Sequence, residues 1–328
     1  MEVRQVTKRF TGTPFTSNLY NPVSLAKQAR TIGDDDIAKT GETELTSLAL
    51  ADTLSVLDDR LQLTLGARRQ RVEDESFSAT TGARTANFDE YATTPAVGLV
   101  VKVRPNISLY ANYIEALTRG PAAPTTAANS GEVFAPFKSR QVEAGAKVDF
   151  GSFSTTLSLF RIEQPSAFTN AATNVFGVDG EQRNRGVELN VFGEPMDGVR
   201  VLGGVMWIDG ELVKTQSGTN DGNTAVGVSR VNLNLGGEWD PAILPGLTLT
   251  ARLIHTGSAY LDAANTQRVP HWTRYDLGAR YATKLGGHPL TLRATVENLL
   301  DRNYWTASDF GLSLGAPRTA LLSATVDF

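Results

Sequence analysis

The sequence predicts an all-β protein: an antiparallel, up-and-down transmembrane β-barrel with about 14 strands. Segments in which apolar and polar residues alternate recur along the whole chain, and this period of two places apolar side chains on one face of a strand. The connections alternate between short and long, as in up-and-down hairpins. No apolar run approaches the roughly 18 residues that a spanning helix needs. We therefore expect residues 1–328 to form one barrel domain.

The alternating segments define the expected strands. Most are close to the roughly 9–11 residues with which a tilted strand crosses a bilayer. In chain order they are a faint one at Val3–Phe10, then Leu45–Val56, Leu61–Val72, Pro95–Arg104, Ile107–Glu115, Lys138–Phe150, Phe153–Ile162, Gln182–Phe192, Val199–Ile208, Val228–Trp239, Leu247–His255, Trp272–Thr283, Leu290–Leu299 and Arg318–Phe328.

The connections between these segments predict two different rims. Every second connection is short, such as "PN" after Arg104 and "GS" after Phe150. The others are long and rich in Gly, Asn, Thr and Ala; they are Thr11–Glu44, Glu73–Thr94, Leu117–Phe137, Glu163–Glu181, Asp209–Gly227, Thr256–His271 and Leu300–Pro317. Tight turns are expected at one rim of the sheet and large loops at the opposite rim.

The two faces of each segment differ in polarity. In "RQVEAGAKVDF" Val142 and Val148 share one face, while Glu143 and Lys147 share the other. A soluble sheet would need a second layer over its apolar face, and the sequence contains no amphipathic helix of useful length. A closed membrane barrel covers that face with lipid and leaves no unpaired edge. Aromatic residues near strand ends suit interfacial girdles; they are Tyr113, Phe150, Trp207, Trp239, Trp272 and Tyr281.

The last expected strand has the same pattern. Leu322, Ala324, Val326 and Phe328 fall on one parity, so the terminal aromatic residue extends the apolar, lipid-facing row.

Composition and motifs argue against several other classes. The net charge is −4 and the basic residues are spread along the chain, which excludes a basic stripe for nucleic acid. There is no Cys, and the three histidines, His255, His271 and His288, are scattered without metal-ligand spacing. No P-loop or GxGxxG motif occurs, and "GDDD" from Gly33 to Asp36 lacks the ligand spacing of a calcium loop. The chain is expected not to be an enzyme and to hold no cofactor or metal.

Several stretches together resemble one known family. They include "LYANYIEALTRG", "FKSRQVEAGAKVDFG", "DGEQRNRGVELNVFGEP", "AVGVSRVNLNLGGEWD", "ATVENLLDRNYW" and the terminal "ALLSATVDF". In this order and spacing they resemble the C-terminal part of the barrel of TonB-dependent outer-membrane receptors, specifically siderophore receptors of the ferrichrome and hydroxamate type. The terminal strand then resembles the family's outer-membrane insertion signal.

The resemblance implies a function and a missing part. It implies a receptor in the bacterial outer membrane that binds ferric siderophores and imports them in a TonB-coupled manner. Family barrels have about 22 strands around a plug, so about eight strands, the plug and the TonB-contacting box are expected to be absent here. Met1 would then begin a truncated reading frame or an excised piece. The implied partners are the siderophore, outer-membrane lipid and lipopolysaccharide, the barrel assembly machinery, and the TonB system through the missing part.

For a ferric siderophore the chelator already holds the iron, so the receptor needs aromatic surfaces and hydrogen-bonding groups at its mouth. The long loops offer Tyr20, Phe88, Tyr91, Phe134, Phe168, Phe176, Tyr260, Tyr304, Trp305 and Phe310. Charges on the polar strand faces are expected to form cross-strand pairs facing the lumen or the plug; they are Glu143, Lys147, Glu188, Arg274, Arg280, Arg293 and Glu297.

Three alternatives remain open at this point. Fourteen strands that close on themselves would form an unplugged passive pore. A chain that never closes would be a non-transporting remnant. A soluble β-sandwich that binds carbohydrate is the third alternative, and the lipid-facing aliphatic rows argue against it.

Overall fold

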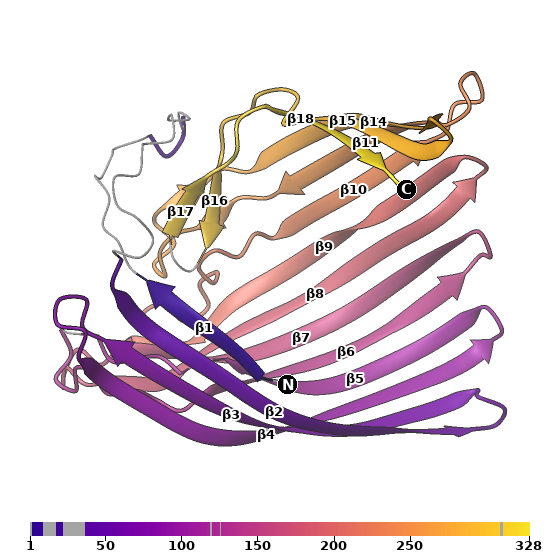
Figure 1. Ribbon diagram of the computed structural model, residues 1–328. Coiled ribbons are helices and arrows are strands. Elements are labelled where there is room, and N and C mark those ends of the chain that lie inside the picture. Colours follow the sequence, from indigo (N-terminus) through magenta and orange to yellow (C-terminus); the bar gives the residue numbers. More distant parts are fainter. Residues whose placement is uncertain (1, 9–17, 22–36, 119, 125, 309–310) are drawn as a thin grey trace.

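A computed structural model describes residues 2–8, 18–21, 37–118, 120–124, 126–308 and 311–328. One antiparallel sheet of 14 strands dominates them, as the sequence predicted (Figure 1). Its strands are β1 (Glu2–Lys8), β2 (Lys39–Val56), β3 (Leu61–Phe77), β4 (Arg84–Arg104), β5 (Ile107–Thr118), β6 (Phe137–Asp149), β7 (Phe153–Thr169), β8 (Phe176–Met196), β9 (Val199–Lys214), β10 (Val231–Trp239), β11 (Leu247–Thr256), β14 (Trp272–Leu285), β15 (His288–Glu297) and β18 (Thr319–Val326).

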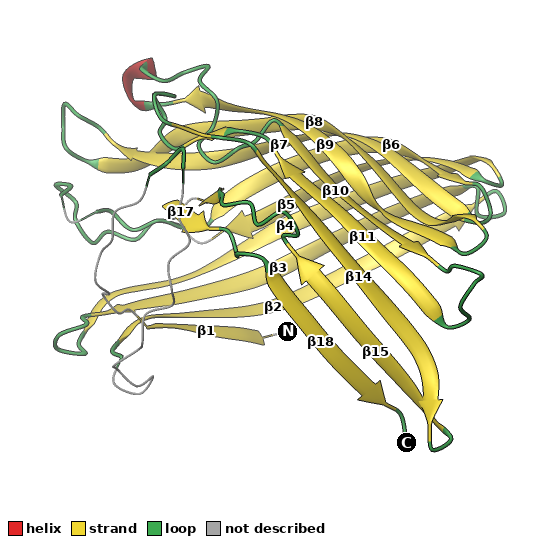
Figure 2. Cartoon of the chain, turned by 90° about the horizontal axis from the view of Figure 1, so that it is seen from above, coloured by secondary structure: helices red, strands yellow, loops and turns green. Residues whose placement is uncertain are grey.

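Each strand of this sheet pairs with the next one along the chain, so the order is that of an up-and-down barrel wall. The wall is strongly curved, with β1 and β18 at its two edges (Figures 1 and 2). In the described residues β1 pairs only with β2, and β18 pairs only with β15. Two small hairpins, β12 (Ala259–Tyr260) with β13 (Arg268–Val269) and β16 (Trp305–Ser308) with β17 (Gly311–Leu314), lie in the loops. A short 3₁₀ helix, η2, covers Gln216–Gly218.

The register joins the apolar faces of neighbouring strands into continuous rows. One row crosses six strands, from β5 to β10, through Ala111, Ala144, Leu159, Val187, Trp207 and Val231. Leu159 is 58% exposed and Trp207 is 50% exposed, although both are large and apolar. Such a continuous exposed apolar face is what a lipid-covered wall requires. We call it the outer face.

The opposite face is polar and more crowded, and we call it the concave face. The next row on this face contains Tyr110, Gly145, Ser158, Glu188, Met206 and Asn232. The concave face as a whole also carries polar strand residues that are nearly inaccessible to solvent: Gln70, Asp74, Thr94, Ser158, Thr248 and Asp276. Side chains converge on the inside of a curved wall, so polar groups there become buried and must find partners.

The terminal strand follows the predicted parity. Leu322, Ala324 and Val326 of β18 lie opposite Ala294, Leu292 and Leu290 of β15, on the outer face. Phe328 lies just beyond β18, where its fully exposed ring is 5.4 Å from the ring of His288.

One predicted girdle residue lies on the other face. Trp272 shares the parity of Arg274 and Asp276 on β14, and its ring stacks on Tyr304 rather than facing lipid. Its position at a strand end suggested the interface, but the alternation of β14 puts it on the concave face.

The two rims differ as predicted, but several long loops are shorter than expected. The predicted loop Glu73–Thr94 is mostly paired strand, because β3 and β4 extend to residues 77 and 84. The predicted loop Glu163–Glu181 shrinks in the same way to residues 170–175 between β7 and β8. Pairing continues beyond the lipid-covered band, where water contacts both faces and apolar–polar alternation is no longer needed.

No helix in the described part of the chain is long and apolar enough to cross a membrane.

Candidate functional site: the loop rim and the concave face

The loops of the long-loop rim bond to one another in pairs. In the first pair, the Asn129 side chain donates to the carbonyl oxygen of Phe176 at 2.9 Å and accepts from the Phe176 amide at 2.8 Å. The amide of Ala128 donates to the carbonyl oxygen of Asn174 at 2.7 Å. The rings of Phe134 and Phe176 meet edge to face, with centroids 5.6 Å apart. Two predicted ligand residues, Phe134 in the β5–β6 connection and Phe176 at the start of β8, thus form one aromatic surface.

The second pair joins the β9–β10 connection to the β11–β14 connection. Asn265 exchanges two hydrogen bonds with the backbone of Thr224, both 2.9 Å long. The Gly227 amide donates to the carbonyl oxygen of Tyr260 at 2.9 Å, and Ala225 is completely buried beneath these contacts. The hydrogen bond to its backbone carbonyl therefore fixes the position of the predicted ligand residue Tyr260.

Asp262 organises the tip of this second pair. Its carboxylate accepts from the backbone amide of Gln267 at 2.7 Å, and from the amide and hydroxyl of Thr266 at 3.0 and 2.7 Å. The Gln267 amide, followed by the Thr266 hydroxyl, lowers the pKa of Asp262 below its ordinary value of 3.8.

The stretch "VENLLDRNYW" changes from strand to loop at Asn298. This residue has a φ of 52°, and β15 ends just before it, two residues earlier than predicted. Its amide donates to Asp276 Oδ1 at 2.8 Å, and its side chain donates to the carbonyl oxygens of Arg302 and Ala316 at 2.9 and 3.0 Å. Asn298 is 1% exposed and ties both ends of the last long loop to the barrel wall.

The same loop places two predicted aromatic residues in different surroundings. Tyr304 is 7% exposed, stacks on Trp272 with ring centroids 4.2 Å apart, and packs closely against Gly315. It supports the base of the loop, so its ring is not open to a ligand. Trp305 donates its indole N–H to the carbonyl oxygen of Asn18 at 3.2 Å, which joins the last long loop to the first.

Tyr91 lies on the outer face, away from the predicted ligand site. It shares the outer parity of Val97 on β4, and its ring receives Arg69 at 5.1 Å. The sequence placed it in a long loop, but the extension of β4 makes it part of the outer face.

The remaining predicted loop aromatics are not brought into one cluster. Phe88 and Phe168 are half-buried within β4 and β7, and Tyr20 is 69% exposed. Phe310 lies outside the described residues.

On the concave face, Glu143 is held by neutral groups. It accepts from the Tyr110 hydroxyl at 2.6 Å and from Gln141 at 3.0 Å. Lys147 Nζ lies 5.1 Å from the centroid of the Tyr110 ring. Tyr110 therefore connects two predicted lumen charges, and the sequence pattern gave no reason to single it out.

Glu188 lines the same part of the wall, a hollow of about 440 Å³ over β3 to β8. It accepts from Asn190 at 3.0 Å, and its cross-strand neighbours are Ser158 and Met206, so no opposite charge lies directly beside it. Asn112 Oδ1 in this hollow is buried without a hydrogen-bond partner among the described atoms. The predicted cross-strand charge pairs are therefore absent from this part of the described wall.

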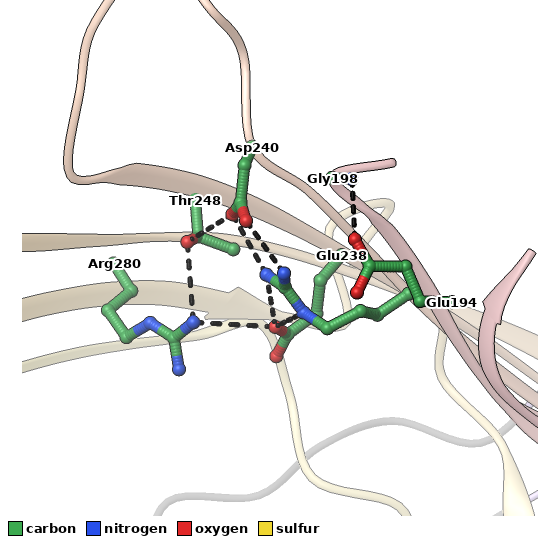
Figure 3. A network of polar contacts seen from close by, with 7 residues as sticks. Glu194, Gly198, Glu238, Asp240, Thr248 and Arg280 are labelled. Atoms are coloured by element: carbon green, nitrogen blue, oxygen red, sulfur yellow. Dashed lines mark hydrogen bonds and ion pairs between the residues drawn. The ribbon is translucent and has the colours of Figure 1, made fainter. Parts of the chain in front are cut away.

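Near the short-turn rim a charge network spans β9, β10, β11 and β14 (Figure 3). Arg200 makes a bidentate contact with Asp240 at 2.6 and 2.8 Å and donates to Glu238 at 3.0 Å. Thr248 donates to Asp240 at 2.6 Å, and Arg280 lies 3.5 Å from Glu238. Sequence reasoning missed Arg200, because only the β9–β10 register places it directly opposite Glu238.

The remaining predicted lumen charges lie on β14 and β15. Arg274 contacts Asp276 at 2.7 Å on its own strand and Glu297 across the sheet at 4.0 Å. Arg293 lies directly opposite Arg280 on one side and Ser323 on the other. Two of the predicted charges, Arg274 and Glu297, thus face each other across the sheet at the longest distance that still counts as an ion pair.

Two histidines that the sequence pattern described as scattered lie close together. The rings of His255 and His271 are 5.9 Å apart, and His255 Nδ1 is 2.8 Å from the hydroxyl of Thr273. Within the described ranges no group of three or more His, Cys, Asp or Glu could hold a metal ion.

Comparison with known proteins shows the family. The family model for TonB dependent receptor-like β-barrels matches residues 4–299. The chain is 40% identical to the ferrichrome receptor FcuA of Yersinia enterocolitica over 95% of its own length and 42% of that protein. It is 27% identical to the ferrichrome outer membrane transporter/phage receptor of Escherichia coli K12, with the same coverage of 95% and 42%.

The solved structure of BauA, the ferric preacinetobactin receptor of Acinetobacter baumannii, is also similar. It is 44% identical and superposes with a TM-score of 0.77 over 94% of this chain and 46% of that one. The chain thus spans less than half the length of these relatives. The chain belongs to the family of TonB-dependent receptor β-barrels, which are bacterial outer-membrane proteins and not enzymes.

Proposed function

We propose that the chain is part of the barrel of a receptor that binds ferric siderophores and imports them across the outer membrane in a TonB-coupled manner. The likeness to a ferrichrome receptor along almost the whole chain carries this proposal. The paired loops support it, because they hold aromatic side chains in fixed positions above the wall. A ferric siderophore brings its own iron ligands, so aromatic contact and hydrogen bonding suffice for recognition.

The aromatic pair Phe134 and Phe176 is the part of this chain that we expect to touch the siderophore. The test uses a chimera in which this chain replaces the matching segment of the Yersinia enterocolitica ferrichrome receptor. Phe134→Ala together with Phe176→Ala should weaken ferric ferrichrome binding by about tenfold, since each large aromatic contact is worth about 1 kcal/mol or more. Phe150→Ala, in the stacked pair with Phe153 near the short-turn rim, is the matched control.

Unchanged binding by the double variant would contradict the role of the aromatic pair. Failure of the chimera to bind any ferric hydroxamate, despite correct folding, would contradict the receptor proposal itself. TonB-coupled uptake would also require parts of the receptor outside this chain. Uptake of ferric ferrichrome is therefore measured in cells that carry the chimera, and not with this chain alone.

We also propose outer-leaflet lipopolysaccharide as a partner, at charges just above the apolar band. Arg140, Arg161 and Arg185 lie on the outer face of β6, β7 and β8. Their side chains are 62%, 54% and 56% exposed, whereas their acidic partners Glu115, Glu163 and Asp209 are 13%, 33% and 26% exposed. The guanidinium groups therefore extend further outward and can donate to phosphate oxygens.

The lipid proposal predicts a loss of bound lipid. Replacing Arg140, Arg161 and Arg185 by Gln should reduce the lipopolysaccharide that copurifies with the chimera by more than half. Arg252→Gln, on the concave face, should leave it unchanged. Equal amounts of lipid in the triple variant would contradict this partner.

The barrel assembly machinery is the proposed partner of the terminal row Leu322, Ala324, Val326 and Phe328. Phe328→Ala should lower the amount of chimera inserted in the outer membrane, and Leu300→Ala should not. Normal insertion of the Phe328 variant would contradict this role.

A passive pore is the principal alternative. A pore of this chain alone would require β1 to pair with β18, and neither strand has such a partner in the described residues. We therefore favour the receptor. Stable single-channel steps from the chain alone in planar bilayers would favour the pore, and their absence would leave the receptor or a non-transporting remnant.

A further inference from the structure

Two arginines on the concave face lie side by side at the short-turn rim. Arg280 of β14 and Arg293 of β15 are directly opposite each other in the register. Both line a hollow of about 600 Å³, which we call the short-rim hollow. Like charges directly opposite each other destabilise a sheet unless an anion lies between them.

Arg280 is fixed in position by the network of Figure 3. One of its terminal nitrogens lies 3.3 Å from the Thr248 hydroxyl and 3.5 Å from Glu238. A guanidinium carries five N–H donors, so these contacts leave donors for another acceptor. Thr248 and Glu238 thus orient Arg280 without using its full capacity.

The carboxylate that lines the short-rim hollow is already engaged. Asp240 also lines the short-rim hollow, but it accepts two bonds from Arg200 and one from Thr248. Within the described residues no acceptor contacts the guanidinium of Arg293, whose other cross-strand neighbour is Ser323. Arg293 therefore lacks a counter-ion among the described residues, and Arg280 shares Glu238 with Arg200.

One side of the short-rim hollow is apolar. It is formed by the β10–β11 turn, including Pro241, Leu244 and Pro245, while Thr248 and Thr291 add hydroxyl groups elsewhere in the lining. A small inorganic anion would use the arginines but would leave this apolar wall in contact with water. A carboxylate side chain flanked by apolar residues would satisfy both parts.

We propose that the short-rim hollow binds an acidic side chain of a polypeptide segment that has apolar neighbours. The carboxylate would lie between Arg280 and Arg293, and the neighbouring apolar side chains would contact the β10–β11 turn. This inference does not depend on siderophore import, because it uses only side chains of this chain. It assigns a binding role to Arg293, for which the wall provides no partner.

The test is calorimetric titration of the full 328-residue chain, folded in detergent micelles. The probe is a tripeptide with a central glutamate between two leucines, blocked at both ends. We expect saturable binding that weakens at least tenfold when glutamine replaces the glutamate. Arg293→Gln should weaken glutamate-peptide binding about tenfold, and Arg280→Gln should do the same.

Arg252→Gln is the matched control, because Arg252 is also an arginine of the concave face but does not line the short-rim hollow. Circular dichroism and resistance to unfolding in detergent verify the fold of each variant. Because Arg280 belongs to the charge network, Arg293→Gln is the decisive variant. No saturable binding, equal binding of the glutamine peptide, or full binding by Arg293→Gln would each overturn the proposal.

Discussion

The outer face and the concave face of the same strands are built on different principles. Along β7, Leu157 and Leu159 face outward and are 49% and 58% exposed, whereas Ser158 between them is 5% exposed on the concave face. The outer face needs only apolar character, because lipid conforms to any shape. The concave face needs specific partners, because a buried polar group without a hydrogen bond costs free energy. The outer face therefore determines that the chain lies in a membrane, and the concave face determines what it can bind.

The largest expected effect comes from placing a charge on the outer face. Leu157→Arg puts a cation in the middle of the apolar band, and should lower the free energy of unfolding by about 2–4 kcal/mol. Thr156→Arg lies one residue earlier on the water-facing concave face, directly opposite Lys147 and diagonal to Glu188, and should change it by about 1 kcal/mol or less. Urea unfolding of the chain in lipid vesicles measures both. A similar loss for the two variants would break the distinction between the faces.

A smaller loss is expected where the concave face anchors the last long loop. Asn298→Ala removes the side-chain bonds to the backbone of Arg302 and Ala316, and leaves their partly buried carbonyl groups without these partners. The free energy of unfolding should fall by about 1–3 kcal/mol, and proteases should cleave the loop faster. Leu300→Ala, at a residue that is 67% exposed, is the control. An unchanged cleavage rate in the Asn298 variant would show that the loop is anchored elsewhere.

A single neutral hydrogen-bond donor on the concave face should matter less. Tyr110→Phe removes the 2.6 Å bond to Glu143 but leaves the bond from Gln141. We expect a loss of about 1 kcal/mol in the same unfolding assay. Tyr281→Phe, on the outer face, should have almost no effect. Equal losses for the two tyrosines would argue against specific polar packing on the concave face.

The smallest effect is a pH dependence at the loop rim. The folded state lowers the pKa of Asp262, so its stabilising contribution is fully present above the ordinary value of 3.8 and is lost as pH falls through the lowered folded value. The amides of Thr266 and Gln267 should therefore exchange faster in acid than at neutral pH, after correction for intrinsic rates. Asp262→Asn should remove this dependence, and a dependence that persists in the variant would assign it to another group.

The sequence predicted the strand number because the outer face repeats one simple pattern. Lipid imposes period-two alternation on every strand of the wall, so all 14 strands of the main sheet in the described residues were found. The ends of β3, β4, β7 and β8 at the long-loop rim were not predicted as strand, because water contacts both of their faces and the alternation is lost there. Trp272 was predicted at the lipid interface but lies on the concave face, and Tyr91 was predicted in a loop but lies on the outer face of β4. The face on which each residue lies depends on the register and on where the strand ends.

The candidate site was predicted less completely, because its geometry depends on contacts between segments far apart in sequence. Phe134 and Phe176 were both proposed, but their meeting depends on the bonds of Asn129 across two loops. Arg200 and Tyr110 were missed, since nothing in their local sequence distinguishes them from other strand residues. Asn298 looks like part of a strand until its left-handed backbone and its partners are known.

A cysteine scan along β8 tests the lipid-covered outer face most directly, and it is possible because the chain has no native Cys. Single cysteines replace Val187, Glu188, Leu189, Asn190, Val191 and Phe192 in the chain folded in lipid vesicles. Positions 188, 190 and 192 should react with a water-soluble maleimide, whereas positions 187, 189 and 191 should be shielded by lipid and react with a lipid-soluble one. Equal reactivity with the water-soluble reagent at all six positions would contradict the lipid-covered outer face.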